Sequence, residues 1–220
     1  MPASPQPPGQ STPRSRRRGT LVRLILMVCA VGLFIIGYQW GNRHRFGQAP
    51  AIEGVLLAPA MALPAFTLAD QRGRPLDRDG LRDRWTLIAM GDLTQARGQL
   101  GIQRLLEVFH RLGGNAELQG RLQLVLAASR QPADLAEDFG RLSPALRLVA
   151  DEAGDLGKLA SLLGEPPQPD PGQAPTLYLV GPHARLLAIF PPSQPAQRVA
   201  DDLTLLAQWP PEALETLAHE

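Results

Sequence analysis

Residues 85–98, WTLIAMGDLTQARG, constrain the fold of this chain more than any other segment. The first part, residues 85–90, is an apolar run of strand length, which is typical of a strand buried on both faces of a central sheet. A short polar loop follows, and apolar residues then recur at helical spacing from Ile102 to Leu112, before two glycines that end the helix. The pattern predicts a buried strand, a loop at the edge of the sheet and a helix that packs on the sheet.

The neighbouring segments predict further strands and helices. An alternating apolar segment with a turn at residues 70–74 indicates a hairpin. Strands are expected over residues 122–126, 146–150, 176–180 and 186–190. Helices are expected over residues 135–142, 156–163 and 195–208, and Trp209, Pro210 and Pro211 stop the last one. We therefore expect one α/β domain over residues 63–209, with a central mixed sheet flanked by helices, and a C-terminal tail over residues 210–220.

Residues 21–40, LVRLILMVCAVGLFIIGYQW, predict a transmembrane helix, because about 20 apolar residues cross a hydrocarbon layer of about 30 Å. Arginines stand at positions 14, 16, 17 and 18 before the segment, and fewer follow it, so the positive-inside rule keeps the N-terminus in the cytoplasm. We expect a disordered basic tail over residues 1–20, a signal-anchor helix over residues 21–40 and a tether over residues 41–62. A cleaved signal peptide is the alternative, since a basic region before an apolar run fits both.

Composition narrows the location and the chemistry. Lys158 is the only lysine among 22 basic residues, a bias that is typical of GC-rich bacterial genomes. The predicted location is therefore the bacterial inner membrane, with a single pass and the C-terminal domain in the periplasm. The formal net charge is only +1, so the chain as a whole has no strong positive potential that would attract nucleic acid. Cys29 is the single cysteine, which excludes an intramolecular disulfide, a redox pair of thiols and a cysteine metal cluster, and we expect neither a metal nor a cofactor.

Three segments and their order carry a resemblance to a known superfamily. They are FTLADQRGRPLDRDGLRDRWTLIAMG at residues 66–91, APTLYLV at residues 174–180 and GPHARLLAIFPPSQPAQRVADDL at residues 181–203. Together they resemble the thioredoxin superfamily over residues 63–208. Within it they are similar to membrane-anchored members, the SCO family of cytochrome oxidase assembly proteins and the TlpA-like reductases. The resemblance implies a thioredoxin-like fold and a cis peptide bond before Pro175.

The chain departs from both families at the residues that carry their chemistry. The TlpA-like pattern implies thiols at about Thr94 and Arg97, and the SCO pattern implies them at about Gln95 and Gln99. A SCO protein also has a copper-binding histidine where this chain has residues 172–174, Gly-Gln-Ala. Copper sites of this kind need soft thiolate or imidazole ligands, and thiol exchange needs an ionised sulfur. The resemblance therefore implies a degenerate member with neither function.

The resulting expectation is a membrane-anchored protein that is not an enzyme and that binds another protein. The resemblance indicates a respiratory oxidase subunit or an assembly factor as its partner. We expect an extended segment of the partner to lie in a groove and to form hydrogen bonds with unpaired backbone groups there. The groove is predicted at Thr94, Gln95, Ala96, Arg97, Ala174, Pro175 and Thr176.

Other functions stay open at this point. The first is a thiol–disulfide oxidoreductase or a peroxiredoxin-like enzyme. The second is copper delivery through histidines and Met61 or Met90. A third is anion binding at Thr94 and Arg97 through the free backbone donors of a helix start, against ordinary capping of an exposed helix end.

Overall fold

The computed structural model describes residues 27, 29–34, 49–70, 72–130, 132–141, 143–151, 154–165 and 170–217. Two compact units divide the chain, Met1–Gln48 and Ala49–Glu220. In the first unit, residues 29–34 are helical. Among the described residues, no helix has the length and apolar character that a membrane crossing requires. The predicted tail over residues 1–20 and most of the predicted transmembrane helix lie outside the described residues.

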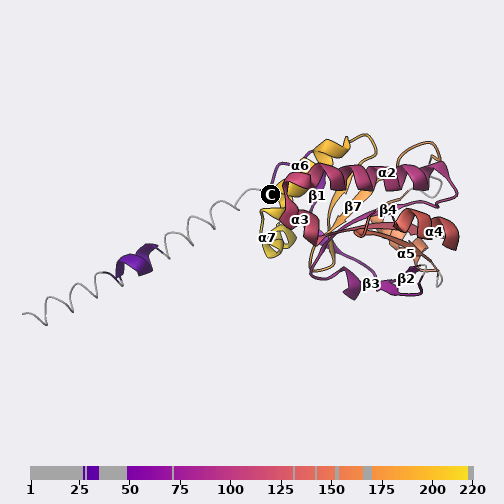
Figure 1. Ribbon diagram of the computed structural model, residues 1–220. Helices are drawn as coiled ribbons and strands as arrows, with labels where there is room; N and C mark the ends of the chain where they lie inside the picture. Colours follow the sequence, from indigo (N-terminus) through magenta and orange to yellow (C-terminus); the bar gives the residue numbers. More distant parts are fainter. Residues whose placement is uncertain are drawn as a thin grey trace, which may run out of the picture. The chain divides into compact units, whose positions relative to one another are not determined.

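One mixed sheet of eight strands forms the centre of the second unit (Figure 1). Its order is β1-β8-β7-β4-β5-β6-β2-β3, in which β4, β5 and β6 run parallel and the other pairs are antiparallel. The strands are β1 (Val55–Ala62), β2 (Thr67–Asp70), β3 (Pro75–Asp77), β4 (Trp85–Met90), β5 (Leu122–Ala128), β6 (Leu146–Ala150), β7 (Leu177–Val180) and β8 (Arg185–Phe190). Every residue of β4 is buried, which confirms the prediction of a central strand.

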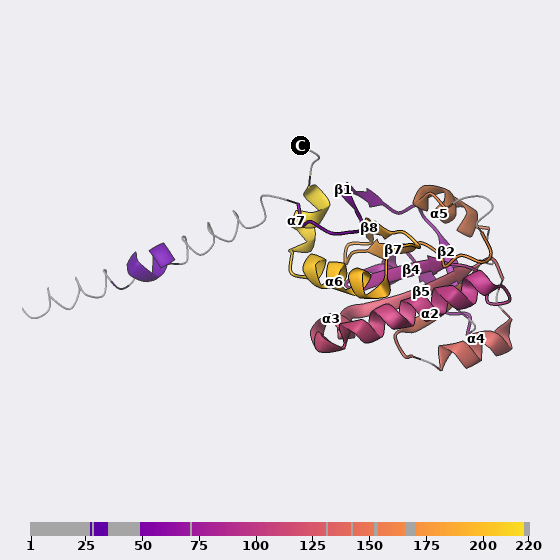
Figure 2. The ribbon, with the colours of Figure 1, turned by 90° about the horizontal axis from the view of Figure 1, so that it is seen from above.

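Helices cover both faces of the sheet. They are α2 (Ala96–Arg111), α3 (Ala116–Arg121), α4 (Ala133–Gly140), α5 (Leu156–Leu163), α6 (Ala196–Ala207) and α7 (Pro211–Thr216). Figure 2 shows α2 and α6 on one side of the sheet and α5 on the other. Consecutive residues of β4 enter different cores because side chains alternate along a strand: Leu87 packs with Leu105 of α2, and Ile88 packs with Leu159 of α5. The expected mixed sheet flanked by helices is confirmed.

Residues 55–62, which were expected to belong to the tether, instead form β1 at the edge of the sheet. β1 pairs antiparallel with β8, from Val55 opposite Ile189 to Ala62 opposite Arg185, and its register shifts between Leu56 and Met61. The alternation of apolar and polar residues that marks a half-buried strand is missing here, because alanines and Pro59 interrupt the segment. The compact unit therefore begins well before residue 63.

Two short helices were also missed. α3 lies between α2 and β5, and Asn115 caps it by accepting a hydrogen bond from the Leu118 backbone N–H at 3.1 Å. α7 lies in the segment that was expected to be a tail. Pro210 and Pro211 follow the end of α6, as the sequence predicts, but Pro211 is also the first residue of α7, a position that proline favours. Leu214 of α7 is fully buried in the core.

Candidate functional site

The loop between β4 and α2 turns back tightly on the start of the helix. A Cβ atom on Gly98 would collide with the carbonyl of Asp92, and one on Gly91 would lie 3.0 Å from the Gly98 Cα atom. The backbone at these positions approaches so closely that only glycine fits. The side chains at the tip of the loop, Thr94, Gln95 and Ala96, are exposed.

Asp92 fixes the base of this loop to the end of β5. Its carboxylate accepts hydrogen bonds from the Ser129 backbone N–H at 3.0 Å and from the Ser129 hydroxyl at 3.1 Å. The Arg130 backbone N–H donates to the same carboxylate at 3.4 Å. The backbone and the hydroxyl of Ser129 therefore both donate to Asp92, and these hydrogen bonds hold the loop against the end of β5.

Arg97 is buried instead of lining an open groove. Its Nη2 atom donates to Glu165 Oε2 at 2.9 Å, and both side chains are only 6% exposed. Its Nη1 atom donates to the Gln173 carbonyl at 3.4 Å. The Tyr178 hydroxyl donates to the other oxygen of Glu165, Oε1, at 2.9 Å. The network joins the start of α2, the segment after α5 and strand β7.

The electrostatics of this network are those of a structural ion pair. Burial raises the pKa of the Tyr178 phenol, and the negative charge of Glu165 and the hydrogen bond to it act in the same direction. The phenol therefore stays protonated and remains a donor. Sequence reasoning missed Glu165 and Tyr178 because one follows a helix end and the other lies within an apolar strand, and neither stands in a recognisable motif.

The second predicted segment, residues 174–176, packs against α2. A Cβ atom on Gly101 would lie 3.0 Å from Pro175 Cγ, so the small residue in α2 makes room for the proline. The Pro175 carbonyl accepts a hydrogen bond from Arg104 Nη1 at 2.7 Å. Among the described residues, the only cis peptide bond joins Ala58 to Pro59. The bond before Pro175 is therefore trans, and the expectation of a cis proline is wrong.

Arg104 fixes two loops at once. Besides Pro175, its guanidinium donates from Nη2 to the carbonyls of Pro191 at 2.6 Å and Gln194 at 2.9 Å. The side chain is buried, and that burial lowers its pKa to about 10. All three of these acceptors are backbone carbonyl oxygens, so Arg104 serves to hold the segments before β7 and after β8 against α2.

The structure brings the two predicted segments together but closes much of the space between them. Arg97 and Pro175 are buried, Ala174 and Thr176 are half-buried, and the exposed part of the predicted groove is the loop tip at residues 94–96. The guanidinium of Arg97 is paired with Glu165 and offers no free charge to an anion, whereas anion binding through the backbone donors of the helix start stays a prediction.

Copper does not fit this site. The guanidinium of Arg97 is a buried cation close to the position at which the resemblance places a thiol, and it would repel a metal cation. Among the described residues, no group of three His, Cys, Asp or Glu side chains is placed to hold a metal ion. Met90 is buried in the core, Met61 lies on the edge strand β1, and His183 pairs through Nδ1 with Glu215 at 2.9 Å.

Comparisons with known proteins come from solved structures, since no protein-family model and no curated protein matches the chain. Apo Sco1 from Thermus thermophilus is similar with a TM-score of 0.57 and 19% identity, over 73% of this chain and 99% of that one. Copper-bound ScoI from Arabidopsis thaliana is similar with a TM-score of 0.54 and 12% identity, over 67% of this chain and 99% of that one. BsSco, a member of the Sco family of cytochrome c oxidase assembly proteins, is similar with a TM-score of 0.55 and 12% identity, over 70% of this chain and 99% of that one. The chain has the thioredoxin-like fold of these Sco proteins, which confirms the predicted fold.

Proposed function

We propose that this chain is a membrane-anchored, non-catalytic thioredoxin-like protein that acts by binding another protein in the assembly of a respiratory cytochrome oxidase. The single observation that carries the proposal is the buried ion pair of Arg97 and Glu165, because Arg97 stands at one of the positions at which the resemblance to TlpA-like reductases implies a thiol. A guanidinium held by a carboxylate supplies neither a nucleophilic sulfur nor a copper ligand. Because the domain keeps the fold but has neither of these reactive groups, we propose that it functions by contact with a partner protein.

The likeness to Sco structures supports the choice of partner. BsSco belongs to a family of cytochrome c oxidase assembly proteins, and the same fold extends over 70% of this chain. We propose an oxidase subunit or an assembly factor as the partner of this chain. The proposed location is the bacterial inner membrane, with residues 21–40 as a single-pass anchor and the C-terminal domain in the periplasm, as the arginines before the apolar segment favour.

The proposed contact surface is the loop tip at residues 94–96 together with the half-buried residues Ala174 and Thr176. The tip is exposed and rests on a rigid base, because Asp92 and Arg97 are both fixed by hydrogen bonds. A fixed, exposed loop loses little conformational freedom when it binds, which favours affinity. The groove residues that are buried, Arg97 and Pro175, support this surface from below and are not expected to touch the partner.

Co-purification of the full chain from the native membrane tests the proposal. We expect an oxidase subunit or an assembly factor to be recovered after cross-linking, and Gln95→Arg at the loop tip to lower the recovery. Gln95 is exposed and its side chain makes no capping hydrogen bond, so the variant should fold. Gln103→Arg, on the exposed face of α2, introduces the same change as a control. Recovery of neither class of protein, or equal recovery with both variants, contradicts the proposal.

A further inference from the structure

A pocket of about 440 Å³ lies at the opposite end of the sheet from the candidate site. It is lined by the first residues of β5 and β6, Leu122 and Leu146, and by Arg84, which directly precedes β4. These three strands are parallel, so their beginnings meet at one edge, whereas the loop of the candidate site follows the end of β4. The volume is within the range of small-molecule sites, about 300–1,000 Å³.

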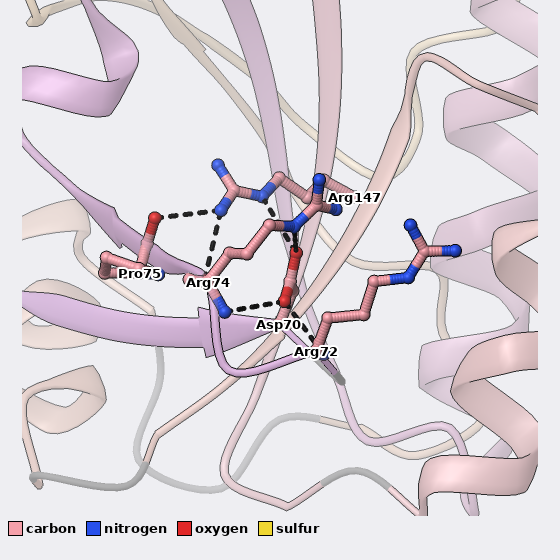
Figure 3. Close-up of polar contacts among 5 residues, drawn as sticks. All are labelled: Asp70, Arg72, Arg74, Pro75 and Arg147. Carbon is pink, nitrogen blue, oxygen red and sulfur yellow. Dashed lines mark hydrogen bonds and ion pairs between the residues drawn. The ribbon is translucent and has the colours of Figure 1, made fainter.

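The charged side chains of this pocket, here called the basic pocket, are Arg74, Arg84 and Arg147. Arg74 comes from the turn between β2 and β3, and Arg147 comes from β6. Figure 3 shows the side chains of Arg74 and Arg147 gathered around the carboxylate of Asp70. Arg74 Nε donates to Asp70 Oδ2 at 2.8 Å, and Arg147 Nη2 donates to the Pro75 carbonyl at 2.8 Å.

Asp70 orients these guanidiniums without neutralising the pocket. Its side chain is 1% exposed, and it accepts hydrogen bonds from the backbone N–H groups of Arg72 and Arg74, each at 2.9 Å. Burial alone would raise the pKa of Asp70, but these hydrogen bonds outweigh it and lower the pKa, so the carboxylate is charged. Even with Asp70 and the nearby Asp77 counted, the basic pocket keeps a net positive charge.

Arg147 is influenced by both signs of charge. Burial is the largest cause of its lowered pKa, and the Arg74 guanidinium acts in the same direction, whereas Asp70 and Asp77 raise it. Within the described part of the chain, the η nitrogens of Arg74 and the whole guanidinium of Arg84 have no hydrogen-bond partner, so they are available as donors.

A second, independent observation also indicates a ligand. Gln123 lines the basic pocket and is 8% exposed, and its Nε2 atom is buried with no hydrogen-bond partner among the described residues. Thr86, opposite Gln123 in the register of β4 and β5, likewise has a buried hydroxyl without a partner. A buried donor without an acceptor costs free energy, so an unpartnered amide in a residue that lines the basic pocket needs an explanation.

We propose that the basic pocket binds the phosphate group of a small molecule, with Arg74, Arg84 and Arg147 as charged donors and Gln123 as a neutral donor. Guanidiniums match phosphate oxygens in geometry and charge. The donors outnumber the two oxygens of a carboxylate, whereas a phosphate offers enough oxygens to accept from all of these side chains.

Calorimetric titration of the full chain with inorganic phosphate, at constant ionic strength, tests the proposal. We expect saturable binding and a rise of the unfolding temperature with phosphate concentration. Arg84→Gln should weaken binding by about tenfold or more, because a charge-assisted hydrogen bond is lost at an exposed residue that the fold does not need. Gln123→Leu should also weaken binding while the chain stays at least as stable as the unmodified one, since it removes an unpartnered buried amide.

The controls separate a built site from general charge attraction. Arg141→Gln removes one charge from an exposed residue at the end of α4 and should bind phosphate like the unmodified chain. Absence of saturation, or equal binding by Arg84→Gln, Gln123→Leu and the unmodified chain, would overturn the proposal. Binding of succinate as tightly as phosphate would overturn the choice of phosphate over carboxylate. None of these results depends on whether the candidate site binds a partner protein.

Discussion

At the scale of single residues, the structure depends most on the buried pair of Arg97 and Glu165. Replacing Arg97 by methionine leaves a carboxylate buried without its partner, and we expect the free energy of unfolding to fall by about 3–5 kcal/mol. Arg97→Met combined with Glu165→Gln removes both charges and should cost less than Arg97→Met alone. Urea unfolding measures the free energy of unfolding of the unmodified chain and of these two variants.

Arg141→Met is the matched control for this prediction. Arg141 forms an ion pair with Glu137, but both side chains are exposed, at 68% and 64%, so its loss should cost at most about 1 kcal/mol. A loss for Arg97→Met as small as the loss for Arg141→Met would show that the buried pair does not stabilise the fold.

Tyr178 gives the same network a pH dependence. Its pKa is raised in the folded chain, so above about pH 10 the unfolded chain releases the phenol proton first. Stability from this group is complete below pH 10 and is lost as the pH rises toward the folded pKa, at up to about 1.4 kcal/mol per pH unit. Chemical unfolding between about pH 9 and pH 11 should therefore show a steeper alkaline loss for the unmodified chain than for Tyr178→Phe.

The comparison of slopes isolates the tyrosine. Lys158 also has a raised pKa, through its hydrogen bond to Asp155, but it is present in both chains and contributes equally to both slopes. Identical slopes for the two chains would contradict a protonated, buried Tyr178.

The residues of the candidate site could be predicted only in part. The position of the loop at residues 94–97 beside residues 174–176 follows from the order of strands and helices, which the sequence pattern indicates. The partners of Arg97 do not follow, since Glu165 lies 68 residues along the chain and no local pattern connects them. From the sequence alone, an arginine in the first turn of a helix that follows a loop is expected to be exposed, whereas Arg97 is buried.

At the scale of elements, Asp202 of α6 holds the segment that leads into β1. Its carboxylate accepts from the backbone N–H groups of Glu53 at 3.2 Å and Gly54 at 3.0 Å, and from Gln194 Nε2 at 2.8 Å. Asp202→Ala should lower the free energy of unfolding by about 1–3 kcal/mol, because these donors lose their acceptor. Hydrogen exchange should accelerate in β1 more than in β4.

Asp201→Ala is the neighbouring control. Asp201 is exposed, and its carboxylate accepts a hydrogen bond from Gln197 at 3.0 Å on the same helix. Its replacement should leave exchange in β1 unchanged. If Asp201→Ala and Asp202→Ala accelerate exchange equally, the anchoring role of Asp202 is refuted.

Elements with strong periodicity were predicted well, and elements without it were not. β4, β6 and α5 occur where the apolar patterns place them, and Gly164 ends α5 in the left-handed conformation that glycine favours, with φ of +72°. β1 was missed because an edge strand needs little apolar surface and its pairing with β8 is a long-range contact. α3 and α7 are single short helices whose burial depends on neighbours far away in the chain.

At the scale of the whole molecule, the proposed topology is tested by reporter fusions. We expect alkaline phosphatase fused after the last residue to be active and green fluorescent protein at the same place to be dark, because the positive-inside rule places the C-terminal domain in the periplasm. The opposite pair of results would refute the proposed topology. An immunoblot of the membrane fraction distinguishes the two N-terminal possibilities. An uncleaved anchor leaves the chain at full length, whereas removal of a signal peptide shortens it.

The buried pair of Arg97 and Glu165 also limits which descendants this sequence can produce. Replacing Arg97 by cysteine would leave the carboxylate of Glu165 buried without its cation, so the change would lower the free energy of unfolding before a second thiol was present. Thiols at Gln95 and Gln99, which are exposed, would leave the pair intact, so the buried pair restricts one route to a redox-active loop and leaves the other open.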